Sequence, residues 1–306
     1  MLSRVADCAY WMSRYLERAE HTARLGDVCL GLTLDRSSDS IRRLMCSVGG
    51  PPGGHGAANG LEADLPPEER FNLTIEGCVV AARENARQVR EQISSEMWEQ
   101  LNRLYLHVRR QRIVGGSAFY SHVKEAAHLF QGVTDSTMTH GEVWHFIQIG
   151  RSIERAAATA GMLGAHFEDS GERDGGIGAY VSWAALLRSC SGFEAYCQRY
   201  TADLKPERVA EFLLLNADFP RSVRFAIDTV EASLRSVART AGRRSTARVD
   251  RLAGRLRASL DYSQIDEIIA DSLESYVLGI RRQCDQVHTA LYQTYISYSI
   301  ESAIGT

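Results

Sequence analysis

The 306-residue sequence lacks the pairs and runs by which several classes of protein are recognised. Its seven cysteines include no Cys-x-x-Cys pair, which excludes a zinc knuckle and a thioredoxin-like motif, and their odd number argues against a disulfide framework. No apolar run approaches the roughly 18 residues of a membrane-spanning helix, and no leader sequence begins at Met1. These absences predict a cytoplasmic protein with no membrane partner.

Lysine and proline are scarce. Only two of the 35 cationic residues are lysine, and this bias fits either a GC-rich genome or bidentate capture of carboxylate or phosphate by guanidinium groups. The six prolines fall in three places, and the long stretches between them favour helices. The arginine-rich segment 235–257 is interrupted by Asp250 and has no interleaved aromatic residues, so a nucleic-acid partner is not expected. A Walker A or dinucleotide glycine pattern is also missing, so the chain should not hold ATP in the P-loop manner.

Apolar residues recur at three- and four-residue steps along most of the chain, which predicts an all-α bundle of about ten helices. A first helix begins at Ser3, and the others are expected at 36–47, 70–93, 95–112, 116–131, 141–167, 180–201, 206–216, 220–240, 243–259 and 263–301. The last is long and the most regular, and its apolar stripe, which begins with Ile265, Ile269 and Leu273, must be buried against several neighbours. The Gly- and Pro-rich segment 48–67 is expected to be a flexible loop within a single domain, 1–306.

Two of the expected helices match each other. Residues 14–24 (RYLERAEHTAR) and 151–161 (RSIERAAATAG) agree at six of eleven positions, at an offset of 137 residues. The match aligns Arg14, Glu17 and Arg18 with Arg151, Glu154 and Arg155. It suggests a duplicated helical unit with halves of about 1–140 and 141–306.

On a helix, the two arginines and the glutamate of each copy share one patch, and His21 continues that face in the first copy. If the two helices face each other, two glutamates and four arginines meet near the centre of the bundle. Buried charges are tolerated only when they are paired. The residues therefore form a structural Arg–Glu network or an anion site if they are buried, and an ordinary solvated face if they are not. In an anion site, Glu17 and Glu154 are the candidate catalytic residues, since they would orient the arginines or accept an amine proton. The candidate anion-binding residues are then Arg14, Arg18, His21, Arg151 and Arg155.

Two further groups of arginines suit an anion. Arg83 and Arg87 lie on one face of an expected helix, where the alternative is ordinary salt bridges. Arg221 and Arg224 follow Pro220 near a helix start, where free backbone N–H groups favour an anion and the alternative is plain capping.

Metal chemistry is not expected. A di-iron bundle requires glutamate and histidine ligands on paired helices. The first copy has Glu20 and His21, but the second copy has alanines at the matching positions. His140 and His145 are five residues apart, not four as in zincins.

The opening MLSRVADCAYWMSRYLERAEHTAR resembles the start of the bacterial Alpha-E proteins, a helical family named for a paired Glu-Arg motif. Other stretches are similar to the family as well: AARENARQVREQISSEMWEQLN (81–102), GRSIERA (150–156), LLRSCSGFEAY (186–196), DFPRSVRF (218–225) and VHTALYQTY (287–295). The chain departs from the family in its Gly- and Pro-rich segment 48–66. In the second copy Ala157 and Ala158 stand where the first has Glu20 and His21, so the halves should not be equivalent.

The resemblance implies a protein encoded beside, or fused to, a circularly permuted ATP-grasp protein, with transglutaminase-like peptidases as frequent neighbours. It therefore implies an accessory subunit of an amide ligase that helps bind the peptide acceptor or an acyl-phosphate intermediate. No cofactor is expected in this chain, and ATP and magnesium would act only through the ligase. Two alternatives stay open: a structural scaffold or adaptor for a ligase or peptidase complex, and a stand-alone transferase with an Arg/Glu-lined pocket.

Overall fold

A computed structural model describes residues 3–34, 67–110, 116–167, 177–240 and 248–297. These residues form twelve α-helices and one π-helical turn and contain no strand, which confirms the all-α prediction. The helix expected at 36–47 lies outside the described residues, and so do residues 48–66 of the loop expected at 48–67, whose last residue, Pro67, begins a helix.

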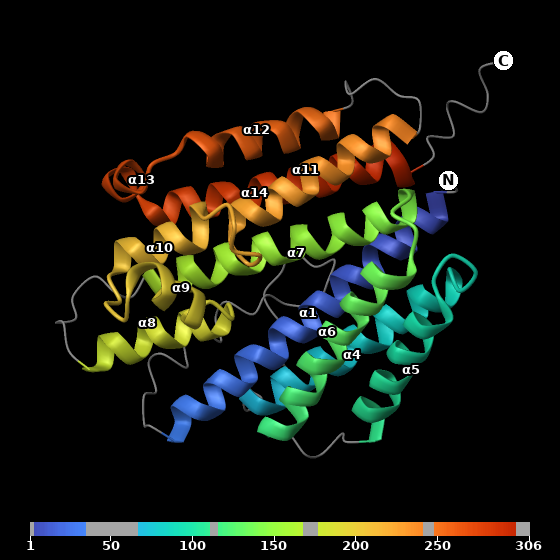
Figure 1. Cartoon of the computed structure of the whole chain (residues 1–306), viewed down its shortest axis with the longest axis horizontal. Coiled ribbons are helices and arrows are strands. Elements are labelled where there is room, and N and C mark those ends of the chain that lie inside the picture. The colour runs from blue at the N-terminus through green and yellow to red at the C-terminus, as the bar shows by residue number, and fades with distance from the viewer. Residues whose placement is uncertain (1–2, 35–66, 111–115, 168–176, 241–247, 298–306) are drawn as a thin grey trace.

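The helices are stacked in tiers around two long central ones. In chain order they are α1 (Ser3–Leu34), α4 (Pro67–Gln88), α5 (Ser95–Arg110), α6 (Ser117–Thr137), α7 (Glu142–Phe167), α8 (Ile177–Ser189), α9 (Phe193–Tyr200), α10 (Pro206–Leu215), α11 (Val223–Thr240), α12 (Arg248–Tyr262), α13 (Ile265–Asp271), α14 (Leu273–Leu291) and the π-turn η1 (Tyr292–Ile296). The central pair, α1 and α7, pack on each other (Figure 1). On the far side of α7 lie α11 and α14, covered by α12, and on the far side of α1 lie α4 and α6, covered by α5.

One helix expected at 180–201 is two helices, α8 and α9. The chain turns at Ser191, which has a left-handed φ of 53°, a conformation that no helix interior allows. At the next residue, Gly192, a Cβ atom would lie 3.1 Å from the ring of Phe219 and 3.2 Å from that of Phe212. The break therefore lets two phenylalanine rings pack against the bare backbone.

The long C-terminal helix expected at 263–301 is also interrupted. It divides at Ser272, whose Oγ accepts a hydrogen bond from the N–H of Ser275 (3.2 Å) and so caps α14. The break shifts the apolar stripe, because Ile269 is 37% exposed while its neighbour Ile268 is buried. Beyond the break, α14 and η1 continue to Ile296, and 298–301 lie outside the described residues.

The contact between α1 and α7 is unusually close. Gly150 of α7 lies against α1, where a Cβ atom would collide with the Ser13 hydroxyl and the Tyr10 carbonyl oxygen. On α1, Met12 and Ala19 are fully buried, as the apolar stripe of the helix predicts. This close crossing brings the two Glu-Arg turns face to face.

Candidate functional site

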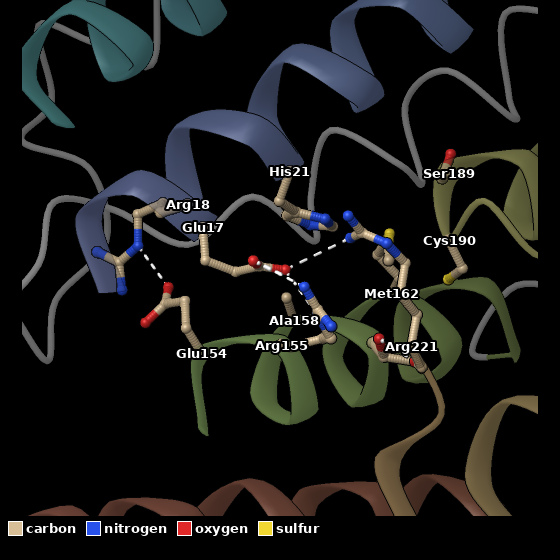
Figure 2. Close-up of a pocket in the computed structure, with 11 residues that line it drawn as sticks. Glu17, Arg18, His21, Glu154, Arg155, Ala158, Met162, Ser189, Cys190 and Arg221 are labelled. Atoms are coloured by element: carbon tan, nitrogen blue, oxygen red, sulfur yellow. Dashed lines mark hydrogen bonds and ion pairs between the residues drawn. The ribbon is translucent and has the colours of Figure 1, made fainter. Parts of the chain in front are cut away.

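Each glutamate of the repeat is paired across the two helices, and Figure 2 shows Arg18 with Glu154 and Arg155 with Glu17. Glu154 of α7 accepts hydrogen bonds from Arg14 Nε (2.8 Å) and Arg18 Nε (2.6 Å) of α1. Glu17 of α1 accepts hydrogen bonds from Arg155 Nε (2.7 Å) and Nη2 (2.9 Å) of α7. The two motifs therefore meet as the repeat predicts, and the pairing is crossed between the helices.

The pairing is not symmetric, because a third segment contributes an arginine. Arg221, between α10 and α11, places Nη1 3.5 Å from Glu17 Oε1 and Nη2 2.8 Å from Glu20 Oε2. Its backbone oxygen accepts a hydrogen bond from Thr159 of α7 (3.0 Å), which anchors the turn to the cluster. By contrast Arg151, the repeat counterpart of Arg14, pairs with no carboxylate in the described residues and donates to the side-chain oxygen of Gln148. Arg221 thus complements Glu17 where the repeat predicts Arg151.

Several side chains that the sequence analysis did not assign to the site complete the network. Glu20 is fully buried and pairs with Arg24 as well as Arg221, and its position three residues after Glu17 is the signal that could have identified it. Gln131 of α6 donates to Glu17 Oε2 (3.1 Å).

On the other side of the network, Arg14 Nη1 donates to Tyr10 Oη (3.2 Å), and Tyr10 Oη lies 2.8 Å from His288 Nδ1 of α14. The cluster therefore links α1 and α7 to the C-terminal helix. No spacing in the sequence predicts this contact, because its partners are 278 residues apart.

The arginines keep the three carboxylates ionised despite their burial. Burial raises the pKa of Glu154, but Arg14 and Arg18 outweigh it and lower this pKa to about 2. The same balance lowers the pKa of Glu17 and Glu20, through Arg155 and Arg221 in the first case and chiefly Arg221 in the second.

His21 does not have the positive charge expected of an anion-binding residue. Burial lowers its pKa to about 4, so the imidazole is neutral near pH 7 and adds no positive charge. The described cluster then contains three glutamates, 17, 20 and 154, against six arginines, 14, 18, 24, 151, 155 and 221. The cluster is therefore cationic, with guanidinium N–H groups in excess of carboxylate oxygens.

Two small hollows lie beside Glu17, and neither is the size of a substrate. One, of about 10 Å³, is lined by Arg18, His21, Arg155 and Arg221 together with Cys190 of the loop after α8 (Figure 2). The other, also about 10 Å³, is lined by Arg151, Gln131 and Ser13. A volume of this order holds about one water molecule. As folded here, the cluster is a nearly closed network.

One arginine that lines each hollow has an unused donor. Arg18 Nη1 and Arg151 Nε are buried and have no hydrogen-bond partner among the described residues. Arg14, in contrast, uses all three of its nitrogens, on Glu154 and Tyr10. Arg18 and Arg151 are therefore the arginines of the repeat with capacity left for an anion.

A protein-family comparison matches residues 1–296 to the Alpha-E family, described as a predicted alpha-helical domain with a conserved ER motif. The chain belongs to the Alpha-E family. It is 27% identical, over 308 aligned positions, to the uncharacterized proteins Rv2567 of Mycobacterium tuberculosis H37Rv and Mb2597 of Mycobacterium bovis. Each alignment covers 89% of this chain but only 34% of the relative, so this chain spans about a third of the length of those proteins. No solved structure matches it.

The other candidate residues of this Alpha-E protein lie away from the cluster. Arg83 of α4 donates to Asn102 of α5 (2.6 Å), and Arg87 forms an exposed pair with Glu84. Arg224 pairs with Asp261 (2.9 Å). The structure therefore gathers seven of the predicted anion-binding or catalytic arginines and glutamates into one cluster, 14, 17, 18, 151, 154, 155 and 221, and leaves Arg83, Arg87 and Arg224 outside it.

The described ranges contain no group of three or more His, Cys, Asp or Glu side chains placed to hold a metal ion. Within the same ranges, no helix is both long enough and apolar enough to cross a membrane.

Proposed function

We propose that this Alpha-E protein is the accessory subunit of a circularly permuted ATP-grasp amide ligase in the cytoplasm. In this role the Glu-Arg cluster binds a carboxylate or acyl-phosphate oxygen of the peptide substrate. The ligase binds ATP and magnesium, and the present chain supplies fixed guanidinium groups. A transglutaminase-like peptidase is a further partner of the same complex.

The observation that supports the proposal most strongly is that the buried Glu-Arg cluster contains more arginines than glutamates. Six guanidinium groups against three carboxylates leave a net positive charge, and an isolated buried cation is unfavourable without a counter-ion. Within the described part of the chain, Arg18 Nη1, Arg24 Nε and Arg151 Nε are the buried guanidinium nitrogens of the cluster without a hydrogen-bond partner, and two of them belong to arginines of the repeat. Guanidinium binds planar carboxylate and phosphoryl oxygens through such N–H groups, and fixed donors favour charge that develops on an acyl phosphate.

The glutamates suit positioning better than proton transfer. A carboxylate whose pKa is lowered to about 2, as for Glu154, is a weak base and remains ionised throughout the neutral range. Two arginines already occupy each of Glu17 and Glu154. We therefore assign them the task of holding the arginines in place, and we do not assign them acid–base chemistry.

A second candidate function, that of a structural scaffold, is favoured by the small size of the hollows. Each holds about one water molecule, so the cluster could serve only to fix α1 against α7 in a scaffold for the ligase complex. The two functions differ in one respect. An anion site requires the spare donors of Arg18, whereas a scaffold requires only the pairs.

Arg14 and Arg18 provide a matched test, because both bind Glu154 but only Arg18 has unused donors. The protein would be co-expressed with an ATP-grasp protein of the same organism, and ATP-dependent peptide product would be measured per folded complex. We expect Arg18→Met to lower product formation about tenfold or more, the loss associated with one charged hydrogen bond. Arg14→Met should destabilise the fold and change activity per folded complex less than about twofold, since its donors never reach the substrate.

Two outcomes would contradict the proposal in different ways. Equal activity per folded complex for both variants and the wild type would leave the scaffold and remove the anion site. A ligase that neither binds the wild-type protein nor changes its product in its presence would remove the ligase partnership itself.

A further inference from the structure

The hollow beside Arg151, one of the two next to Glu17, lies between three helices. It is lined by Ser13 and Glu17 of α1, by Gln131 and Thr134 of α6, and by Arg151 of α7, together with apolar side chains. Helix α1 packs on both of the other helices (Figure 1). The volume of about 10 Å³ holds about one water molecule, so a peptide, a phosphate or a carboxylic acid is too large for it. A monatomic anion is the negatively charged ligand nearest to that size.

Arg151 has fewer partners than Arg14, its counterpart in the repeat. Arg14 uses all three of its nitrogens, on Glu154 and on the hydroxyl of Tyr10. At the offset of 137 residues, the position of Tyr10 is taken in the second copy by Ile147, which has no hydroxyl and lines the hollow. Arg151 Nε is buried and has no hydrogen-bond partner among the described residues. The hollow therefore lies beside an arginine that lacks both the hydroxyl and the carboxylate of its counterpart.

The charges around Arg151 favour an anion in the hollow. The pKa of Arg151 is lowered, first by burial and then by the cations Arg155 and Arg221, against the opposing effect of Glu17 and Asp135. Both carboxylates are already occupied, Glu17 by two arginines and Asp135 by two side-chain N–H groups. Three guanidinium groups therefore stand against two carboxylates, and a small anion would supply the missing negative charge.

The hollow also offers hydrogen-bond donors. The unused Nε of Arg151 is one of them. The side-chain amide of Gln131 donates one of its two hydrogens to Glu17 Oε2 (3.1 Å), which leaves the second for another acceptor. The hydroxyls of Ser13 and Thr134 donate to backbone oxygens of their own helices (2.9 and 2.8 Å), so they do not compete for these donors. The guanidinium disfavours a cation here, and a water molecule would leave its charge uncompensated.

We propose that the hollow beside Arg151 binds a single small inorganic anion of the size of chloride. Arg151 Nε and the Gln131 amide donate to the ion, which acts as the counter-ion that the second copy of the repeat lacks. The inference does not depend on the ligase partnership, since it needs only this chain and the salt of its solution. One bound ion would balance only part of the positive charge of the cluster, so the hollow beside Arg18 keeps its capacity for a substrate oxygen.

A chloride dependence of stability tests the site in solution. The thermal midpoint would be measured near pH 7 in sodium chloride and in sodium gluconate of equal ionic strength, because gluconate is too large for the hollow. We expect about 0.2 M chloride to raise the wild-type midpoint by about 3 °C relative to gluconate. Arg151→Met should lose this difference. The control Arg87→Met, which removes an exposed arginine outside the cluster, should keep it.

Bromide in a crystal would locate the ion directly. A wild-type crystal soaked in sodium bromide should show an anomalous peak in contact with Arg151 Nε and the Gln131 amide. This measurement uses the unaltered protein, so it decides the matter even if Arg151→Met does not fold.

Several results would overturn the inference. Equal midpoints in chloride and gluconate with no bromide peak would mean that the hollow holds water. A chloride effect that Arg151→Met retains, or a bromide peak only beside Arg18, would place the ion elsewhere. A bromide peak at Arg151 without any chloride effect on the midpoint would mean binding at crystal concentration only, and the inference would fail.

Discussion

Replacement of Glu154 by glutamine should lower the free energy of unfolding by about 3 kcal/mol. The carboxylate is paired with two arginines whose side chains are only 14% and 18% exposed, Arg14 and Arg18. Loss of the charge leaves both guanidinium groups without a counter-ion in a poorly solvated place. We place the effect at the lower end of the range for buried ion pairs because an edge of each arginine reaches solvent.

Urea unfolding of the wild type and Glu154→Gln measures this effect directly, and in a thermal scan the melting temperature should fall by about 6 to 12 °C. The control is Glu84→Gln, which removes the partner of exposed Arg87 and should leave stability unchanged within error. A Glu154→Gln protein as stable as the wild type would mean that the cluster is solvated and contributes little to the fold.

Acid should destabilise this protein in two stages. In the first, burial lowers the pKa of His21 from 6.5 to about 4 in the folded state. Below pH 6.5 the unfolded chain therefore binds a proton that the folded protein does not, and stability falls until the pH reaches about 4. At about 1.4 kcal/mol for each pKa unit, His21 alone accounts for about 3 kcal/mol.

In the second stage, at lower pH, protonation of the glutamates destabilises the folded protein. The folded-state pKa of Glu154 is about 2 against 4.5 in the unfolded chain, and those of Glu17 and Glu20 are lowered as well. Their contribution is complete above pH 4.5 and is lost as the pH falls towards 2.

Unfolding free energies measured at several pH values for the wild type and His21→Gln separate the stages. The variant should lose most of the slope between pH 6.5 and 4 and keep the slope below it, because its carboxylates are unchanged. His107 and His145 also have lowered pKa values, so a small slope should remain in the upper window. An unchanged slope in the variant would show that His21 is protonated in the folded protein.

The sequence predicted those features that depend on local periodicity. The helices at 95–112 and 141–167 are observed as Ser95–Arg110 and Glu142–Phe167, because their apolar stripes and polar flanks agree with their burial. It did not predict the breaks at Ser191 and Ser272. The first depends on packing of distant phenylalanine rings, and the second on a serine cap that also occurs within ordinary helices.

The candidate site was likewise predicted only in the part that depends on local sequence. The repeat predicted that the two motifs meet, since two matched charged faces in one bundle are most easily satisfied by each other. It did not predict that Arg221 complements Glu17 while Arg151 turns to Gln148, because Arg221 arrives from a segment with no repeat counterpart. The links to Gln131 and His288 are tertiary contacts without a local signal.

The central claim, that the Glu-Arg turns pair across α1 and α7 and not within one helix, is tested most directly by double-mutant cycles on unfolding free energy. We expect the cross-helix pair Glu17–Arg155 to show a coupling of about 2 kcal/mol, because the two side chains form two hydrogen bonds. The same-helix pair Glu17–Arg14 should be additive within about 0.5 kcal/mol. Coupling within the helix and additivity across it would contradict the crossed network.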